Sequence, residues 1–549
     1  MQLLLHRFRI GLGRTLDGWG ITAIFILLLL SVPLWILAWN FFGNPESEIW
    51  DHLKKTVLSG YISNTLSVVG GVTLITLVVG VSSAWIVTAY DFPLRKFFEW
   101  SLVLPLAIPP YVAAYTYTGI FDYTSPIEIY TSDLLGYQNT YADIMSMRNL
   151  IIILGFVMFP YVYLITRASF IQQASGVIET SRLLGRSTFS TFFSVVLPLA
   201  RPAIAGGLIL VTMELLNDYG AMKYFGVDTF TVAICQVWFS FSDLNTAIRL
   251  AIYLMLVSLV IIMIERFMRG KVRYSGSSRQ VPLRKIRLKG IKAGLAFMLC
   301  FLPFFLGFII PVIQLIVWTA TTFKETLKYD FVTLIQHSFF LAITAALIAV
   351  FFSIIVVYAV RLKKNKLMKF MLRSVNAGYA IPGAVIAIGV MIPFIYIHNT
   401  LVDVFGKNYN MEHGLMVGGI IAVLFAYIVR FLVLAVNPVE AGFEKVNQNI
   451  EEASRSLGAS SLRTLWKIDM PVMKPAILAS AIFVFVSVLK EIPVTIIIRP
   501  FNFETLATKS FEMAKNELLA QSAGMSLVIV LAGLIPVIIL NKLFTRQQG

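Results

Sequence analysis

The sequence predicts an all-α polytopic membrane protein with about twelve transmembrane helices, arranged as two tandem parallel six-helix repeats. Two observations lead to this fold class. Of the 549 residues, 58% are hydrophobic and only 13% are charged, whereas soluble proteins carry about 25% charged residues. Apolar runs of roughly 20 residues, the length that crosses a bilayer, occur at 19–42, 62–89, 98–120, 149–172, 200–219, 244–265, 292–319, 336–360, 374–397, 414–436, 475–497 and 523–544.

The basic residues are concentrated in alternate loops of the chain. The net charge is +16, and the basic residues gather before the first span, after the sixth span and after the eighth. These are alternate loops, so the positive-inside rule places them and both termini in the cytoplasm. The charge is therefore interpreted as a topology signal beside membrane lipid, and no nucleic-acid partner is predicted.

The cysteines and the N-terminal segment predict neither a disulfide framework nor a cleaved signal peptide. Cys235 and Cys300 are the only cysteines, so no disulfide framework or cysteine metal site is predicted. The first apolar run is too long for the core of a signal peptide and lacks a small-residue cleavage pattern, so we expect a retained span.

A polar segment occurs twice. The first copy, residues 179–198, begins Glu179-Thr-Ser-Arg-Leu-Leu-Gly185, and the second, residues 452–471, begins Glu452-Ala-Ser-Arg-Ser-Leu-Gly458. Their matching glutamates, glycines, threonines and prolines lie 273 residues apart without a gap. Pro109 and Pro382 share this offset, as do Asp218 and Glu491. A constant offset over so long a stretch indicates a duplicated unit.

The duplication sets the domain organisation. We expect a first domain at 1–270, a basic cytoplasmic linker at 271–290 and a second domain at 291–549, each domain with six spans. Six is an even number, so both halves have the same orientation, as parallel repeats do. Each polar segment then lies between the fourth and fifth span of its half, on the cytoplasmic side.

The local chemistry of the polar segments predicts two short helices joined at a glycine. The run before Gly185 is a good helix former, and the glycine permits a left-handed turn that ends the helix. A second amphipathic stretch leads to Pro198, and Pro202 is placed where the next transmembrane helix would begin. An ordinary connector between spans is the alternative, but two gapless copies favour a docking element.

Both polar segments resemble the cytoplasmic EAA loop of binding-protein-dependent ABC importer permeases. The first copy departs from that pattern at Thr180, Ser181 and Val195, and the second at Ser454 and Met470, while the spacing holds in both. The resemblance implies two type I permease domains whose loops dock on two copies of a separate ATPase subunit, which binds ATP and Mg²⁺. The coupling residues that it implies are Glu179, Arg182, Gly185, Pro198, Glu452, Arg455, Gly458 and Pro471.

Further segments are similar to the fused iron(III) permeases. They are Glu214 to Gly220, Tyr224 to Val227 and Thr229 to Thr231 in the first half, and Lys490 to Pro493 and Arg499 to Ala507 in the second. This likeness implies Fe(III) as the transported substrate, a periplasmic iron(III)-binding protein as partner, and a bacterial inner membrane as location. Permeases for thiamine, phosphonate or polyamine share the loop and remain alternatives.

The translocation pathway is expected near the proline breaks and the acidic residues of the spans. Pro109 and Pro382 interrupt helices, which a membrane tolerates where neighbouring groups satisfy the backbone. Glu214, Asp218 and Glu491 are candidates for the outer entry, because carboxylate oxygens suit a hard cation. The alternative is that these acids snorkel outward or pair with Lys223 and Lys490. The histidines have no ligand spacing, so no metal site is assigned.

No catalytic motif is found. Gly270-Lys271 and Gly406-Lys407 lack the serine or threonine of a phosphate loop, so the chain is predicted to bind no cofactor and ATP hydrolysis is assigned to the partner. An ion-coupled secondary transporter is a rival that leaves the paired segments unexplained. A membrane-embedded enzyme is a second rival, for which clustered acids or histidines at one depth are missing.

Overall fold

The computed structural model describes residues 18–43, 47–122, 144–172, 181, 184–241, 243–269, 285–363, 368, 372, 381–405 and 419–546. Eleven helices within these residues are long and apolar enough to cross a membrane, and twelve if one bent pair is counted as a single span. The sequence prediction of an α-helical protein with about twelve spans is confirmed.

The chain forms two compact units. Unit 1 contains Met1–Glu46, Asp243–Ile252 and Asp330–Thr508, and unit 2 contains Ser47–Ser242, Tyr253–Tyr329 and Lys509–Gly549. Each unit is therefore built around the central helices of one sequence half and includes terminal helices from the other half. The expected boundaries at 1–270, 271–290 and 291–549 remain a prediction about the repeat, because these packing units follow a different division.

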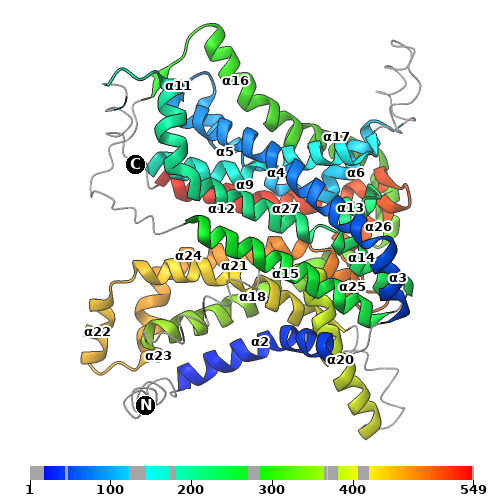
Figure 1. Ribbon diagram of the computed structural model, residues 1–549. Coiled ribbons are helices and arrows are strands. Elements are labelled where there is room, and N and C mark those ends of the chain that lie inside the picture. Colours follow the sequence, from blue (N-terminus) through cyan, green and yellow to red (C-terminus); the bar gives the residue numbers. More distant parts are fainter. Residues whose placement is uncertain are drawn as a thin grey trace. The chain divides into compact units, whose positions relative to one another are not determined.

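Unit 2 is built on three long helices that pack against one another, α4, α9 and α12 (Figure 1). Short elements surround them, and α16, α17 and α27 complete the unit. The bounds are α3 Glu48–Thr56, α4 Leu58–Ala89, β1 Tyr90–Asp91, α5 Arg95–Ser101, η1 Leu104–Ala107, α6 Pro110–Ile120, α9 Met147–Gln172, α11 Thr188–Thr191, η2 Phe192–Val196, α12 Leu197–Asn217, α13 Gly220–Tyr224, α14 Phe230–Gln236, η3 Val237–Phe241, β2 Ile286–Arg287, α16 Ile291–Phe304, η4 Phe305–Ile309, α17 Ile310–Thr326, η5 Leu327–Tyr329 and α27 Leu519–Arg546.

Unit 1 has the corresponding core of α18, α21 and α24, against which α2 and α20 pack. Two helices pass from one unit to the other along the chain, α15 Leu244–Arg269 and α26 Leu506–Lys515. The remaining bounds are α2 Gly18–Gly43, α18 Phe331–Lys363, α20 Gly383–Phe405, α21 Ile420–Lys445, α22 Gln448–Ser456, α23 Ser461–Thr464, η7 Leu465–Asp469, α24 Met470–Leu489 and α25 Pro493–Ile498.

The duplication is visible in the element bounds. Helices α4, α9, α11, η2, α12 and α13 begin at residues 58, 147, 188, 192, 197 and 220, and α18, α21, α23, η7, α24 and α25 begin 273 residues later. Helix α2 and its counterpart α16 also differ by 273 at their first residues, and each belongs to the unit built around the other half. The two halves thus exchange their first spans.

The third span is broken where the prolines predicted a break. Helical residues Arg95–Ala107 and Pro110–Ile120 meet at an angle of 91°. Pro109 lies between them in an extended conformation, as the N-cap of α6. Proline lacks the N–H that would continue the ladder, so the chain turns here instead of running straight through the membrane.

The fifth span begins earlier than expected. Helix α12 starts at Leu197, with Pro198 in its first turn and Pro202 inside the helix, and it continues directly from α11 and the π-helical turn η2. The prediction that a new helix starts at Pro202 is therefore wrong. The equivalent Pro475 likewise lies inside α24. The wider π turn lies directly before Pro198, where an α-helical ladder would need the N–H that proline lacks.

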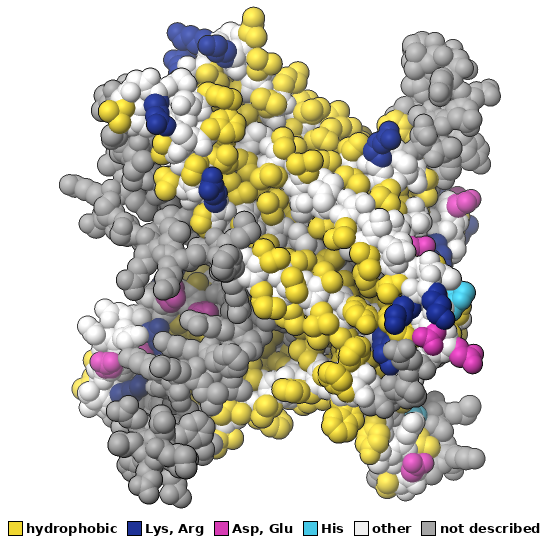
Figure 2. All heavy atoms as spheres, viewed as in Figure 1, with side chains coloured by type: hydrophobic (Ala, Val, Ile, Leu, Met, Phe, Trp, Pro, Cys, Tyr) yellow, Lys and Arg dark blue, Asp and Glu magenta, His cyan; other side chains and the backbone are white. Residues whose placement is uncertain are grey.

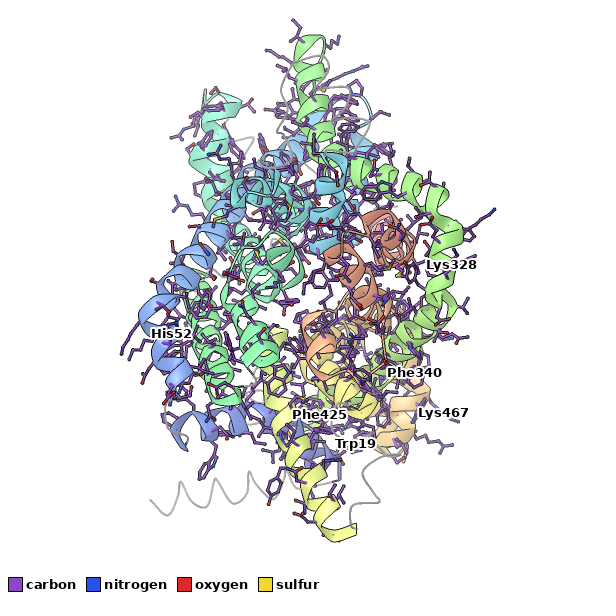
Figure 3. All side chains as sticks on the ribbon, turned by 90° about the vertical axis from the view of Figure 1, so that its right-hand side faces the viewer. Trp19, His52, Lys328, Phe340, Phe425 and Lys467 are labelled. Carbon is purple, nitrogen blue, oxygen red and sulfur yellow. The ribbon has the colours of Figure 1, made fainter. Side chains whose placement is uncertain are left out.

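The surface of each unit agrees with a lipid environment. Hydrophobic side chains cover the middle of the visible face, and Lys, Arg, Asp and Glu lie toward the helix ends (Figure 2). Phe340 on α18 is exposed and lies at the edge of its unit in the view along the helices, and the exposed Lys467 of η7 points away from the unit (Figure 3).

Candidate functional site

Both polar segments turn at a glycine in the left-handed region. The φ angles are +81° at Gly185 and +84° at Gly458, and no atom lies within 4 Å of a Cβ built on either glycine. The turns close with equivalent backbone bonds, Arg186 N–H to the Ser181 carbonyl at 3.2 Å and Ala459 N–H to the Ser454 carbonyl at 3.1 Å. The predicted glycine turn is confirmed in both copies, and backbone conformation alone explains the residue type.

A pair of hydroxyl groups braces each turn. Ser181 Oγ lies 3.1 Å from Thr191 Oγ1, and Ser454 Oγ lies 3.1 Å from Thr464 Oγ1. Both threonines are fully buried. Ser181 and Ser454 are departures from the EAA pattern, and the structure gives them a shared role: each ties the arm before the glycine to the arm after it.

The helix after each glycine has an equivalent cap. The Ser187 hydroxyl accepts a hydrogen bond from Ser190 N–H at 3.2 Å, and the Ser460 hydroxyl accepts one from Arg463 N–H at 3.3 Å. Serine in this position satisfies an amide that the helix leaves unbonded. Turn, brace and cap thus recur at the same positions of both segments.

Among the described residues, each segment exposes three large apolar side chains at matching positions. We call each set a crest: Leu184, Phe189 and Phe193 in the first segment, and Leu457, Leu462 and Trp466 in the second. Leu184 is 78% exposed and Leu457 is 89% exposed, each directly before its glycine. Apolar side chains presented to solvent in this regular way mark an interaction surface. The repeat signal that located the glycines could have located the crests.

The predicted coupling residues lie in different parts of the structure. Glu179 and Arg182 lie outside the described residues. Glu452 and Arg455 lie exposed on α22, and Arg455 is in its last turn, where a cation suits the helix dipole. Pro198 and Pro471 lie in the first turn of α12 and α24.

The base of the second segment contains charged residues that the sequence analysis did not single out as functional. Arg361, near the end of α18, donates from Nε to Glu451 Oε1 at 2.7 Å and from Nη2 to the Val446 carbonyl at 2.7 Å, and it also bonds the Phe443 carbonyl. Glu451 is buried in the first turn of α22. From the sequence, Arg361 is only one of the basic residues after the eighth span, because the equivalent position of the first half is Thr88 and the repeat gives no signal for it.

The second proline break contacts a buried ion pair. Pro382 is buried directly before α20, and Gly383 begins that helix. A Cβ on Gly383 would lie 2.2 Å from Arg430 Nη1 and 3.0 Å from Glu491 Oε1. Arg430 of α21 and Glu491 form a salt bridge in which both side chains are almost fully buried. A side chain at this position would therefore displace the Arg430 guanidinium from its place in this pair.

Asp218 and Glu491 share one contact and differ in another. Asp218 Oδ1 accepts a hydrogen bond from Ala221 N–H at 2.8 Å, and Glu491 Oε1 accepts one from Val494 N–H at 3.1 Å. Each acid thus bonds an amide in the first turn of the short helix after its span. Glu491 also binds Arg430, whereas the position equivalent to Arg430 is Val157. The ion-pair partner of Glu491 is this arginine, which the sequence analysis did not single out.

Glu214 lies half-buried on α12, one helical turn before Asp218. Among the described residues no group of three or more His, Cys, Asp or Glu side chains is arranged to hold a metal ion. The predicted pathway acids are thus placed at the ends of α12 and α24.

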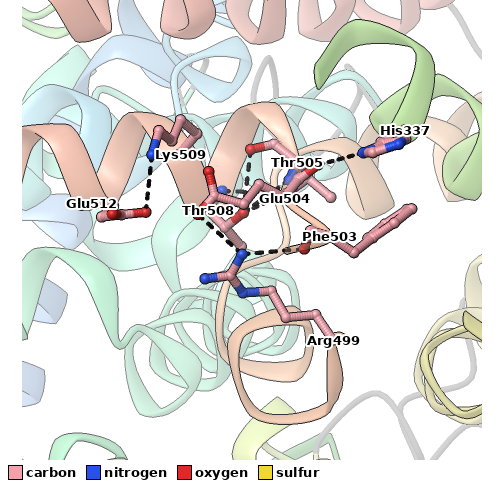
Figure 4. A network of polar contacts seen from close by, with 8 residues as sticks. All are labelled: His337, Arg499, Phe503, Glu504, Thr505, Thr508, Lys509 and Glu512. Atoms are coloured by element: carbon pink, nitrogen blue, oxygen red, sulfur yellow. Dashed lines mark hydrogen bonds and ion pairs between the residues drawn. The ribbon is translucent and has the colours of Figure 1, made fainter. Parts of the chain in front are cut away.

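The segment from Arg499 to Ala507 is braced by polar contacts within unit 1 (Figure 4). Arg499 Nη1 lies 3.2 Å from Glu504 Oε1 and donates to the Phe503 carbonyl at 3.1 Å. His337 Nδ1 lies 3.1 Å from the Glu504 carbonyl oxygen, and the His337 ring stacks on Phe503 at 4.1 Å. This histidine therefore holds a loop in place. Phe501 at the tip of the loop is exposed to solvent.

Comparison with known proteins agrees with these features. The family model described as "Binding-protein-dependent transport system inner membrane component" matches residues 76–274 and again residues 357–548. A Haemophilus influenzae protein named Fe(3+)-transport system permease protein FbpB 2 is 26% identical over 495 residues, covering 89% of this chain and 91% of that protein.

More distant relatives match smaller parts. The ferric transport system permease protein FbpB of Actinobacillus pleuropneumoniae is 22% identical over 84% of this chain and 68% of its own length. The sulfate transport system permease protein CysT of Escherichia coli is 26% identical over 40% of this chain and 78% of its own length. Since the family model matches most of the sequence, in two copies, the chain belongs to the inner-membrane permease components of binding-protein-dependent transport systems.

Proposed function

We propose that this chain is the permease subunit of an ATP-driven importer that carries ferric iron across a bacterial inner membrane. One observation carries the proposal: two polar segments with the same glycine turn, hydroxyl brace, serine cap and apolar crest, 273 residues apart. A repeated docking surface suits a partner that is itself present in two copies. Both termini and both segments lie in the cytoplasm, and the binding protein meets the opposite face.

The crests are the contacts with the ATPase subunits. Leu184 and Leu457 enter apolar pockets of the two copies, while Glu179, Arg182, Glu452 and Arg455 supply polar contacts around them. Gly185 and Gly458 hold the two arms at the required angle, and Pro198 and Pro471 lie where the segments join α12 and α24. Movement of the ATPase subunits is then passed directly into these spans, because each span is continuous with the second arm of its segment.

The pathway lies beside the breaks at Pro109 and Pro382. Glu214 and Asp218 attract the cation in the first half, since hard cations prefer carboxylate oxygens. The negative charge of Glu491 is neutralised by Arg430, so Glu491 mainly helps to hold the geometry of the break at Pro382. ATP and Mg²⁺ bind the partner ATPase, and Fe(III) is substrate.

Iron as cargo is supported by relatives that span both halves of the chain and are named for ferric transport. Relatives named for sulfate transport match only about one half. We therefore favour ferric iron over oxyanions and over thiamine, phosphonate or polyamine.

The docking step is tested by purifying the chain together with its ATPase from the native membrane. Leu184→Asp with Leu457→Asp should abolish recovery of the ATPase, because a carboxylate cannot enter an apolar pocket without a large desolvation cost. Phe501→Asp is the matched control, since it changes another exposed apolar side chain outside the segments. Full ATPase recovery with the double leucine variant would reject the crests as the docking surface.

The cargo is tested in vesicles that contain the permease, the ATPase and the binding protein. ATP-dependent uptake of radioactive ferric iron, unaffected by excess sulfate, thiamine, phosphonate or polyamine, is the expected result. Uptake of one of those solutes without iron would assign the chain to another cargo. Uptake driven by an ion gradient without ATP would support a secondary transporter.

A further inference from the structure

We propose that Arg361 is the positioning residue that joins the second coupling helix, α22, to the transmembrane helices α18 and α21. This inference rests on the proposed function, because it concerns how the docking movement reaches the membrane. It assigns a role to a residue outside the docking surface and outside the pathway.

The contacts of Arg361 link three helices. The guanidinium belongs to α18, its carboxylate partner Glu451 belongs to α22, and its two carbonyl partners, Phe443 and Val446, lie at the end of α21. The guanidinium also lies over the Phe443 ring, at 5.5 Å from the ring centroid. One side chain thus fixes the angle at which the coupling helix leaves the membrane helices.

Arginine suits this joint for chemical reasons. The last carbonyl groups of a helix have no partner within the helix, and the planar guanidinium offers several donors in fixed directions. Arg361 can therefore satisfy the end of α21 and the Glu451 carboxylate together. Tyr358, one turn earlier on α18, stacks on Phe443 and donates to the Ser461 carbonyl at 2.7 Å. The joint thus reaches both arms of the second polar segment.

The first half has other residues at these positions. The positions equivalent to Arg361, Glu451 and Asp469 hold Thr88, Ile178 and Val196. Thr88 donates its hydroxyl hydrogen to Ala84 of its own helix at 2.7 Å. The aromatic contact is retained, because Trp85 and Phe170 pack at 5.7 Å where Tyr358 and Phe443 pack at 5.8 Å. The charged joint is therefore an addition to a shared aromatic base.

Asp469 explains why the positive charge of Arg361 is needed to hold α22 in position. This residue is fully buried in η7, where its carboxyl group lies beside the Glu451 carboxyl group. The charges of Glu451, Arg361 and Arg455 all act on it. Without Arg361, two acids would be left at the base of the segment with less positive charge to hold them, and α22 would move away from the membrane helices.

The first experiment measures the joint in the permease alone. Spin labels at Phe351 and Leu457 report the distance from α18 to the tip of the second segment, and labels at Val78 and Leu184 report the equivalent distance in the first half. All four side chains are exposed. Arg361→Met should broaden the first distance distribution and leave the second unchanged, Arg361→Lys should give an intermediate width, and Thr88→Val should change neither.

The second experiment measures transport and ATP hydrolysis together in vesicles that contain the ATPase and the binding protein. Arg361→Met should lower the number of substrate ions moved per ATP by between about twofold and thirtyfold, the range for residues that carry coupling between sites. If Arg361→Met does not accumulate, Glu451→Gln serves as the second variant and should lower the same ratio. A ratio equal to the wild type in the accumulating variant, with unchanged distance distributions, would overturn the proposal.

The two proposals fail in different ways. If the proposed function is wrong, the wild-type chain will neither bind an ATPase nor transport with ATP. If only this inference is wrong, the wild-type chain will couple transport to ATP hydrolysis normally, and the Arg361 variant will couple them equally well.

Discussion

The two polar segments are alike at their tips and different at their bases. Glycine turn, hydroxyl brace, serine cap and crest recur at matching positions. At the base, Arg361, Glu451 and Asp469 stand where the first half has Thr88, Ile178 and Val196. The proposed docking on two copies of one partner requires the same surface shape twice. The attachment to the membrane helices has no such requirement, so the halves are free to differ there.

The two breaks show the same contrast. Asp218 and Glu491 bond equivalent amides, but Pro110 and Val157 of the first half are replaced by Gly383 and Arg430 in the second. The glycine leaves room for the arginine. We therefore expect variants in the second half to have larger effects than the same changes in the first.

The largest effect is expected from Arg430→Met. This change leaves Glu491 buried without its cation, and breaking a buried pair costs about 3–5 kcal/mol. The thermal midpoint in detergent should fall strongly. Val157→Met, at the equivalent position of the first half, is the control and should change the midpoint far less. Equal shifts would contradict the asymmetry of the two breaks.

Gly383→Ala should cost about 1–3 kcal/mol, the usual penalty of overpacking. The added methyl group would lie 2.2 Å from Arg430 Nη1. The midpoint should drop in the wild-type background and drop much less in an Arg430→Val background, because the colliding group is then gone. Purely additive effects in this double-mutant cycle would show that the arginine is not what requires the glycine.

Asp469→Val should raise the midpoint. The change removes a buried carboxyl group from beside the Glu451 carboxyl group, and the desolvation of such a group costs about 1–3 kcal/mol. Valine is already present at the equivalent position, Val196. A lower midpoint would indicate that Asp469 has a stabilising partner, and the charged base would then need a different explanation.

The smallest effects are expected from Gly185→Ala and Gly458→Ala. Both glycines have open space around them, so the cost is the left-handed backbone alone, roughly 1–2 kcal/mol. The two variants should lower the midpoint equally and weaken ATPase recovery equally. Clearly unequal shifts would break the match between the tips of the segments.

Local and repeated features could be predicted from the sequence. The apolar runs identify the spans, because a helix must be apolar over a fixed length to cross a bilayer. The 273-residue offset identifies the duplication, and the glycine turns follow from a backbone angle that few residues adopt. The break at Pro109 follows from the missing N–H of proline. Each of these conclusions depends on a residue and its neighbours in the chain.

The start of α12 could not be predicted in this way. A proline suggests a helix start, yet Pro202 lies inside the helix because the first turn had already formed at Leu197. Proline is compatible with both positions locally, and the packing of the whole span decides between them.

The sequence by itself therefore determined the class of protein, the twofold repeat and the glycine turns, since these depend on hydrophobic length, periodic spacing and backbone angles. Only the tertiary structure decided that the halves exchange their first spans, that Arg361 holds Glu451 and that Arg430 holds Glu491. These partners are 90 and 61 residues apart in the chain. Ion pairs between distant residues leave no periodic signal, and when only one half contains them, comparison of the two halves conceals them.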